Sequence, residues 1–145
     1  PYCEELAKAI TDEIRRGNRI DTTTKLRNVI EKTLDFLPNN KEKKDIIKKT
    51  CQRTFQALRI DVNNEFEVLY EFMEKLPGAL KPGGRVAILT FHSGEDKLVK
   101  KALKAGYKEG IYSEYARDVV RPSAQECAQN GRARSTKMRW AVKAE

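Results

Sequence analysis

Six consecutive residues, Phe91 to Asp96, bring an imidazole, a hydroxyl and two carboxylates together in the sequence. His92 is the only histidine of the chain, and an imidazole at this place could accept a proton or hydrogen-bond a base or a ribose. Ser93, Glu95 and Asp96 also fit a structural role. Ser93 can cap a helix while Asp96 returns the hydrogen bond, and carboxylates favour the positive end of a helix dipole. The pattern favours capping for these three residues and a site for His92.

The segment before His92 predicts the strand that positions it. Lys81 to Gly84 has the composition of a turn, and Val86 to His92 is a mostly apolar run with two apolar faces. Such a strand belongs in the middle of a sheet covered on both sides, as in α/β folds with parallel strands. Polar residues beyond its carboxyl end lie where open α/β sheets bind ligands. The segment therefore predicts an α/β fold and the place of its site.

A second polar group lies on a predicted helix. Four side chains follow one another at intervals of four, three and four residues, so they share one helix face. This stripe of amides and one guanidinium could line a polar pocket or a phosphate track, but an ordinary solvent-exposed face explains the spacing equally and is favoured on spacing alone. Its members are Gln52, Gln56, Arg59 and Asn63.

The net charge of +8 is unevenly distributed. Residues 1–80 carry 15 Lys and Arg against 14 Asp and Glu, whereas residues 81–145 carry 14 against 7. A basic surface concentrated in one part of a chain indicates a polyanionic partner, nucleic acid first, although a solvated basic loop fits as well. Arginines in a glycine-containing loop suit phosphates, because the guanidinium fork matches phosphate oxygens. The candidate phosphate-binding residues of this region are Arg121, Ser123, Arg132, Arg134 and Ser135.

The order of predicted elements divides the chain in two. Residues 1–60 contain only helices, over 4–16, 22–36 and from 41 onward, and residues 61–145 follow as helix, strand, helix, strand, strand. The last strand, 135–143, alternates between an apolar face with Trp140 and a basic face with Arg139. The second part resembles the back half of a doubly wound sheet, which usually needs about five or six strands. The fold class is therefore α/β with an incomplete sheet.

Several classes of function are not supported by the sequence. No apolar run reaches the roughly 18 residues of a membrane span. Three cysteines without a Cys-x-x-Cys pair indicate a reducing compartment, with neither a disulfide framework nor zinc, and each is most simply a small buried residue. There is no P-loop, no metal-ligand spacing and no nucleophile elbow, and Gly83 and Gly84 precede a strand instead of following one. The residues present do not form a complete active site.

Three blocks of residues occur in the order that they have in a known family. The first is Thr54 to Ile60 with Val62, Asn63 and Glu65; the second is Leu80 to Arg85 with Phe91 to Ser93, Glu95 and Asp96; the third is Arg121 to Ser123, Asn130, Arg132 to Ser135 and Lys137. In these blocks the chain resembles the MraW family, S-adenosylmethionine-dependent methyltransferases of the N4 amine of a cytidine in small-subunit ribosomal RNA. Thr22 to Leu26 also resembles the start of a helix in that family's inserted helical domain.

The resemblance implies a fold for each part of the chain and indicates which part of the methyltransferase is missing from these residues. Residues 1–60 would be a helical insert domain, and residues 61–145 the carboxyl-terminal half of a Rossmann-like class I methyltransferase sheet. The family's amino-terminal half, with its glycine loop and acidic ribose contact, has no counterpart in these residues, so the cofactor-binding residues stay unassigned and the chain alone is expected to be inactive. Four positions depart from the family pattern: Gly94, Lys97, Thr136 and Met138.

The resemblance also implies roles for the candidate residues. His92 and Ser93 would lie beside a flipped cytosine, the stripe on residues 52–63 together with Glu95 and Asp96 would line the substrate groove, and the arginines after residue 120 would hold RNA phosphates. The expected partner is small-subunit ribosomal RNA and no membrane, in a bacterial cytoplasm or an organelle. Exposed sheet edges favour self-association. Two other readings are a non-catalytic RNA-binding module and a helical protein-interaction domain.

Overall fold

The computed structural model describes all 145 residues, which form two compact units. The helical unit comprises Pro1–Asn63 and the sheet unit Asn64–Glu145. The sequence places this boundary after residue 60, three residues before the division between the units. Each unit has its own hydrophobic core and is described by itself.

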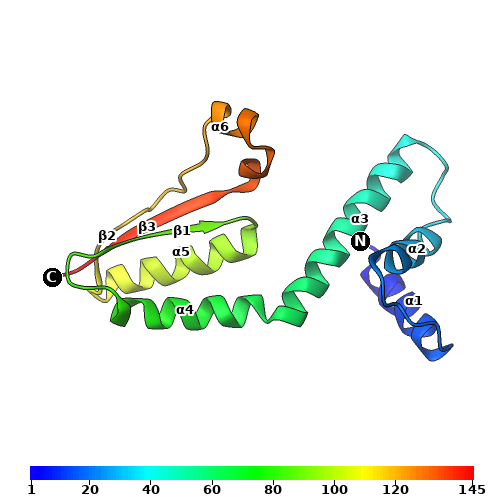
Figure 1. The fold of residues 1–145 in the computed structure, drawn as a ribbon, viewed down its shortest axis with the longest axis horizontal. Helices are drawn as coiled ribbons and strands as arrows, with labels where there is room; N and C mark the ends of the chain where they lie inside the picture. Colours follow the sequence, from blue (N-terminus) through cyan, green and yellow to red (C-terminus); the bar gives the residue numbers. More distant parts are fainter. The chain divides into compact units, whose positions relative to one another are not determined.

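The helical unit contains three helices, α1 (Cys3–Arg15), α2 (Thr23–Thr33) and α3 (Lys41–Asn63) (Figure 1). Thr22 caps α2, because its hydroxyl accepts a hydrogen bond of 3.2 Å from the backbone N–H of Lys25. Apolar residues at helical spacing on α1 and α2 form the core of the unit, and partly buried side chains of α3 pack against them. The fully packed residues are Leu6, Leu26, Ile30 and Leu34.

The sheet unit begins with α4 (Glu65–Ala79) and continues with β1 (Arg85–Thr90), α5 (Ser93–Lys108), β2 (Tyr112–Tyr115), α6 (Ala124–Gln129), a 3₁₀ turn (Gly131–Ser135) and β3 (Lys137–Lys143) (Figure 1). Asn64 has a positive φ of 50°, which ends α3 and starts α4. Pro77 lies inside α4, near its end. The helix continues to Ala79 beyond that proline.

The sheet differs from the predicted one in its strand directions. Its order is β1-β3-β2, and β3 pairs antiparallel with both neighbours. The strands joined by α5, β1 and β2, are parallel to each other but not adjacent, because β3 returns between them. The prediction that the apolar strand before His92 lies in the middle of a parallel sheet is therefore wrong for these residues. β1 is an edge strand, and Leu89 on it is 58% exposed.

Only one face of the sheet is covered by helices. Val86 and Ile88 of β1 pack with Ala141 of β3 against apolar residues of α4 and α5. The predicted alternation of β3 is confirmed, but Arg139 points to the covered face and is 5% exposed, whereas Trp140 points to the other. Arg139 is buried there because α5 supplies its counter-ion, Asp96. The core consists of Met73, Leu76, Val99, Leu103, Tyr112 and Ala141.

Two predictions from composition have different outcomes. No helix has the length and apolar content that crossing a membrane requires. The three cysteines are free thiols, but Cys3 is exposed and only Cys51 and Cys127 are partly buried, so the expectation that all three are buried is wrong for Cys3. Partial burial raises the pKa of the Cys51 thiol.

Candidate active site at the carboxyl end of β1

The turn between β1 and α5 is closed by His92 and Glu95. His92 has the extended backbone of an N-cap (φ −136°, ψ 164°), and its Nδ1 accepts a hydrogen bond of 3.4 Å from the backbone N–H of Glu95. Glu95 reaches back, since its Oε2 accepts a hydrogen bond of 3.0 Å from the N–H of Phe91. We expected Ser93 to cap this helix with Asp96. Ser93 is instead the first residue of the helix, which begins one residue earlier than expected, so His92 occupies the cap position.

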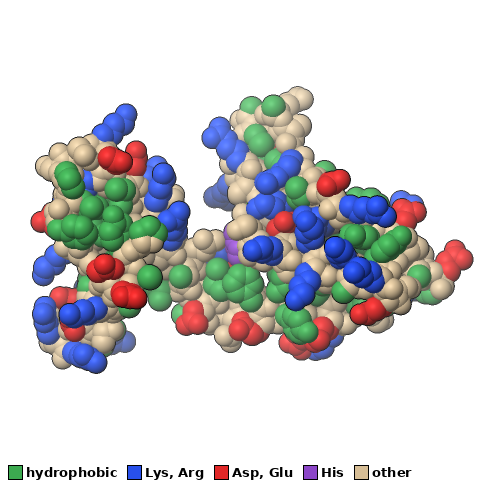
Figure 2. Space-filling model, turned by 180° about the vertical axis from the view of Figure 1, so that it is seen from behind, with side chains coloured by type: hydrophobic (Ala, Val, Ile, Leu, Met, Phe, Trp, Pro, Cys, Tyr) green, Lys and Arg blue, Asp and Glu red, His purple; other side chains and the backbone are tan.

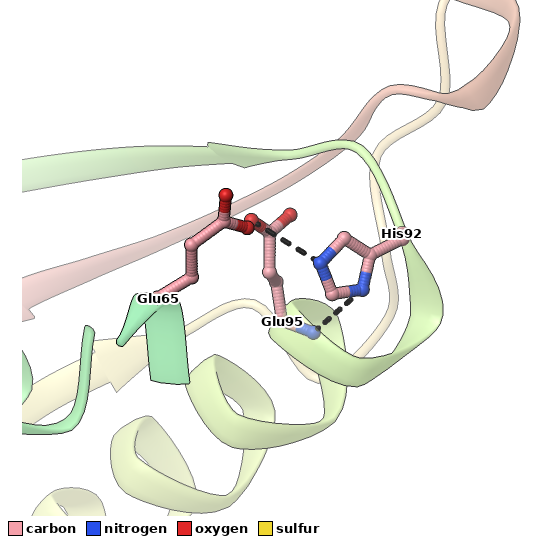
Figure 3. Close-up of side chains that lie close together, drawn as sticks. All are labelled: Glu65, His92 and Glu95. Atoms are coloured by element: carbon pink, nitrogen blue, oxygen red, sulfur yellow. Dashed lines mark hydrogen bonds and ion pairs between the residues drawn. The ribbon is translucent and has the colours of Figure 1, made fainter. Parts of the chain in front are cut away.

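Three side chains of the sheet unit point at one another beside this turn (Figure 3). The N-terminal turns of α4 and α5 bring Glu65 and Glu95 to the imidazole of His92. Their ligand atoms all lie within 4.8 Å of one another, and His92 Nε2 is 3.4 Å from Glu95 Oε1. The ring of Phe66 meets the imidazole edge-on, with 5.7 Å between centroids. We call Glu65, His92 and Glu95 the Glu–His–Glu cluster.

The two nitrogens of His92 are in different situations. Nδ1 accepts the long hydrogen bond of the cap. Nε2 has less than 1 Å² of exposed surface and no hydrogen-bond partner of acceptable geometry, although Glu95 Oε1 is at ion-pair distance from it. A buried ring nitrogen that faces carboxylates without hydrogen-bonding them is unusual, because buried polar groups are nearly always satisfied.

Asp96 lies next to this cluster in the sequence but belongs to a different contact. Its carboxylate accepts hydrogen bonds from Arg139, with 2.7 Å from Nε to Oδ1 and 3.2 Å from Nη2 to Oδ2. Arg139 also donates to the carbonyls of Ala116 and Arg117. These hydrogen bonds hold the pKa of Asp96 below its ordinary value. The carboxylate of Asp96 therefore links α5 to β3. Ser93, the predicted site residue that follows His92, is exposed to solvent.

The predicted RNA-binding residues after β2 are gathered on one exposed segment. Ser123 caps α6 by accepting a hydrogen bond of 3.1 Å from the N–H of Glu126. The Asn130 side chain accepts from the N–H of Arg132 and caps the following 3₁₀ turn. Lys and Arg side chains are crowded on the face of the sheet unit in Figure 2. Arg121, Ser123, Arg132, Arg134 and Ser135 are all exposed.

The polar stripe predicted on the helical unit lies on one helix. Three of its members are exposed and Gln56 is partly buried, and all are within the second half of α3. A groove of about 670 Å³ in the same unit lies between α1, the following loop and α2, and sequence reasoning did not find it. Two of the four cations of its wall, Arg16 and Lys25, are paired with Glu13 and Asp21.

The glycine-containing turn Lys81–Gly84 does not occupy the position of a cofactor-binding loop. The loop that a dinucleotide or a methyl donor needs follows a strand, but the tight turn Lys81–Gly84 precedes β1. Gly84 is explained by that turn, because an added Cβ would lie 2.7 Å from the carbonyl oxygen of Lys81. Glu65, by contrast, is a functional candidate that sequence reasoning missed. Its only signal was membership of the first family-like block, since spacing does not connect it to His92.

Comparison with known proteins gives the chain its family. The profile of the MraW methylase family matches residues 1–144. The chain is 89% identical over 145 residues to ribosomal RNA small subunit methyltransferase H 1 of Agathobacter rectalis, covering 100% of this chain and 41% of the relative. It is 70% identical over 144 residues to the protein of the same name from Lachnoclostridium phytofermentans, covering 99% and 39%. The chain thus spans about two fifths of these relatives, and it belongs to the MraW methylase family.

Proposed function

We propose that this chain is the RNA-side part of a methyltransferase that moves a methyl group from S-adenosylmethionine to the N4 amine of a cytidine in small-subunit ribosomal RNA. The observation that carries this proposal is the match of the family profile to residues 1–144, together with the printed names of the relatives. The strand, turn and helix around His92 support it, because they present polar groups at the carboxyl end of β1.

The reaction sets demands that the residues of this chain can meet in part. The lone pair of an exocyclic amine is delocalised into the base, so the protein must hold the base out of its stack, orient the amine and remove its proton. We propose that His92 and Ser93 border the base and that the arginines near α6 hold RNA phosphates. We further propose that Gln52, Gln56, Arg59 and Asn63 line the RNA path on the helical unit.

The donor requires residues beyond those of the proposed RNA side. We propose that the cradle for S-adenosylmethionine lies outside these residues, and we derive no step through it. We propose that residues of the kind found in the rest of the relatives' length supply that cradle, and that the chain alone is inactive. We also propose that two copies of the chain associate through β1, which is an edge strand of the sheet. The second candidate function is a non-catalytic RNA-binding module, and the position of the Lys81–Gly84 turn before β1 favours it.

Reconstitution separates these two functions. The chain is mixed with labelled S-adenosylmethionine and small ribosomal subunits, alone and together with the remainder of the Agathobacter rectalis relative. We expect methyl transfer to cytidine N4 only in the mixture. If the chain binds RNA but no methyl group is transferred, either by the chain alone or by the mixture, the result contradicts the methyltransferase proposal and supports the RNA-binding module. Micromolar binding of the donor by the chain alone, measured by equilibrium dialysis, contradicts the proposed absence of a cradle.

Two sets of variants test the residue roles. In the reconstituted enzyme, a loss of less than about threefold in turnover for His92→Ala would remove His92 from the base pocket. For RNA binding, each arginine to alanine change at Arg121, Arg132 or Arg134 should flatten the dependence of log K on log salt by about one unit. Lys108→Ala, at the other end of α5 from the cluster, is the matched control and should leave the slope unchanged.

A further inference from the structure

The Glu–His–Glu cluster has the composition of a cation site. An imidazole nitrogen and two carboxylates are ligands for divalent cations of the Zn²⁺ and Mn²⁺ kind, which accept nitrogen and oxygen donors. The three side chains come from two helix N-termini, the first turn of α4 and the cap and first turn of α5. α4 and α5 are in contact with each other within one compact unit.

The distances in the cluster fit a cation after a small closure. Two ligands bound to one Zn²⁺ at about 2.1 Å are at most about 4.2 Å apart. The ligand atoms of the cluster lie within 4.8 Å of one another. Rotation of the flexible glutamate side chains is enough to close this difference.

His92 Nε2 supplies the independent observation. It has less than 1 Å² of exposed surface, lacks a hydrogen-bond partner and faces the two carboxylates (Figure 3). For Nε2 to bind a cation, the ring proton must be on Nδ1. The hydrogen bond that opposes this tautomer, from the Glu95 N–H to Nδ1, is 3.4 Å long, beyond the usual range of about 2.7–3.2 Å. The tautomer with the proton on Nε2, which excludes a cation there, is therefore stabilised by only one long hydrogen bond.

We propose that Glu65, His92 and Glu95 bind one divalent cation of the Zn²⁺ or Mn²⁺ class. A cation between the two carboxylates offsets their mutual repulsion and gives Nε2 the partner that it lacks. The remaining coordination positions are filled by water or substrate oxygen. Nε2 cannot hold a cation and hydrogen-bond a base at the same time, so with the cation bound Nε2 is not a hydrogen-bond partner of the base that His92 borders.

The single histidine makes a direct test possible. The 145-residue chain is labelled with ¹⁵N on histidine and titrated with Zn²⁺, and separately with Mn²⁺, while the imidazole signals of His92 are recorded. We expect Zn²⁺ to shift the Nε2 signal and to saturate at one equivalent, and Mn²⁺ to broaden it. Because the signal comes from His92 alone, cation binding at the free cysteines does not contribute. Unchanged signals up to about 1 mM free Zn²⁺ would overturn the proposal.

Matched variants locate the ligands. Glu65→Gln keeps the size and helix position of the side chain but removes its charge, and we expect it to weaken Zn²⁺ binding by at least about tenfold. Glu67→Gln changes an exposed acid in the same turn of α4 and should leave the affinity unchanged. Equal weakening by both variants would show a non-specific acidic effect and overturn the proposal. The test needs neither RNA nor methyl donor, so its failure is distinct from failure of the proposed function.

Discussion

Glu95 and Asp96 are neighbours in the first turn of α5, yet their carboxylates have opposite surroundings. Asp96 receives two hydrogen bonds from Arg139, which is almost completely buried. Glu95 accepts a backbone N–H with one oxygen, and its other oxygen lies near a histidine nitrogen that has no hydrogen-bond partner. One acid completes a satisfied network, and the other borders an incomplete one. Satisfied networks stabilise a fold, whereas an incomplete group indicates a ligand.

The largest expected effect comes from breaking the satisfied network. Asp96→Ala leaves the guanidinium of Arg139 buried without its counter-ion, and removing one partner of a buried pair costs about 3 kcal/mol of unfolding free energy. Urea unfolding measures this loss. Asp118→Ala, at an exposed acid of the same unit, is the control. A loss for Asp96→Ala no larger than that of the control would show that the pair behaves as a surface contact.

The same pair predicts how stability depends on acid. Because Arg139 holds the pKa of Asp96 below its ordinary value, the ionised carboxylate stabilises the folded state above about pH 4, the value of an unfolded Asp. This contribution is lost as the pH falls through the lower pKa of the folded state. We expect the unfolding free energy of the parent chain to fall more steeply below pH 4 than that of Asp96→Asn. Parallel curves for the two proteins would contradict this assignment.

Sequence reasoning located most elements because local signals define them. Thr22 marks a helix start by its hydroxyl, and the apolar run before His92 marks a strand. Sequence reasoning did not predict the order of the strands, because the apolar run of β1 does not indicate which strand lies beside it. β1 is apolar on both faces, yet it lies at the edge of the sheet, and β3 separates it from β2. The direction and order of strands depend on contacts between distant segments, which periodicity does not encode.

The candidate site shows the same limit at the scale of side chains. The segment from Phe91 to Asp96 was recognised as a group, but its members serve different partners. Asp96 is paired with Arg139, a residue of the last strand, and Glu65 comes from a helix before β1. Charge and spacing identify which residues are able to act. Only the packing of α4, α5 and β3 decides which of them meet.

A smaller effect separates the capping role of His92 from its ligand role. His92→Ala removes the N-cap side chain of α5 and should cost about 1 kcal/mol of unfolding free energy, whereas His92→Asn keeps a strong capping residue and should stay within about 0.5 kcal/mol of the parent. Chemical denaturation measures both. Equal losses for the two variants would mean that the imidazole itself, and not the cap, stabilises the turn. In that case the Glu–His–Glu cluster would be a structural element like the Asp96 pair.

The smallest expected effect on stability concerns Gly94, which lies between the two acids and the histidine cap. A Cβ at this position would lie 2.8 Å from Cζ of Phe66 and 3.2 Å from Cε1 of His92. Gly94→Ala gains helix propensity, worth about 1 kcal/mol at an interior position, but forces the partly buried ring of Phe66 to move. We expect the unfolding free energy to change by less than that amount.

The imidazole signals of His92 should nevertheless shift in Gly94→Ala, because the edge-on ring of Phe66 is displaced from it. Gly106→Ala is the matched comparison, since its Cβ would lie 2.6 Å from ring atoms of Tyr112, which is 3% exposed and packed in the core. That ring has no room to move, so Gly106→Ala should destabilise the sheet unit more than Gly94→Ala. Equal losses at the two glycines would mean that the surroundings of His92 are as rigid as the core, and a rigid cluster could not close on a cation.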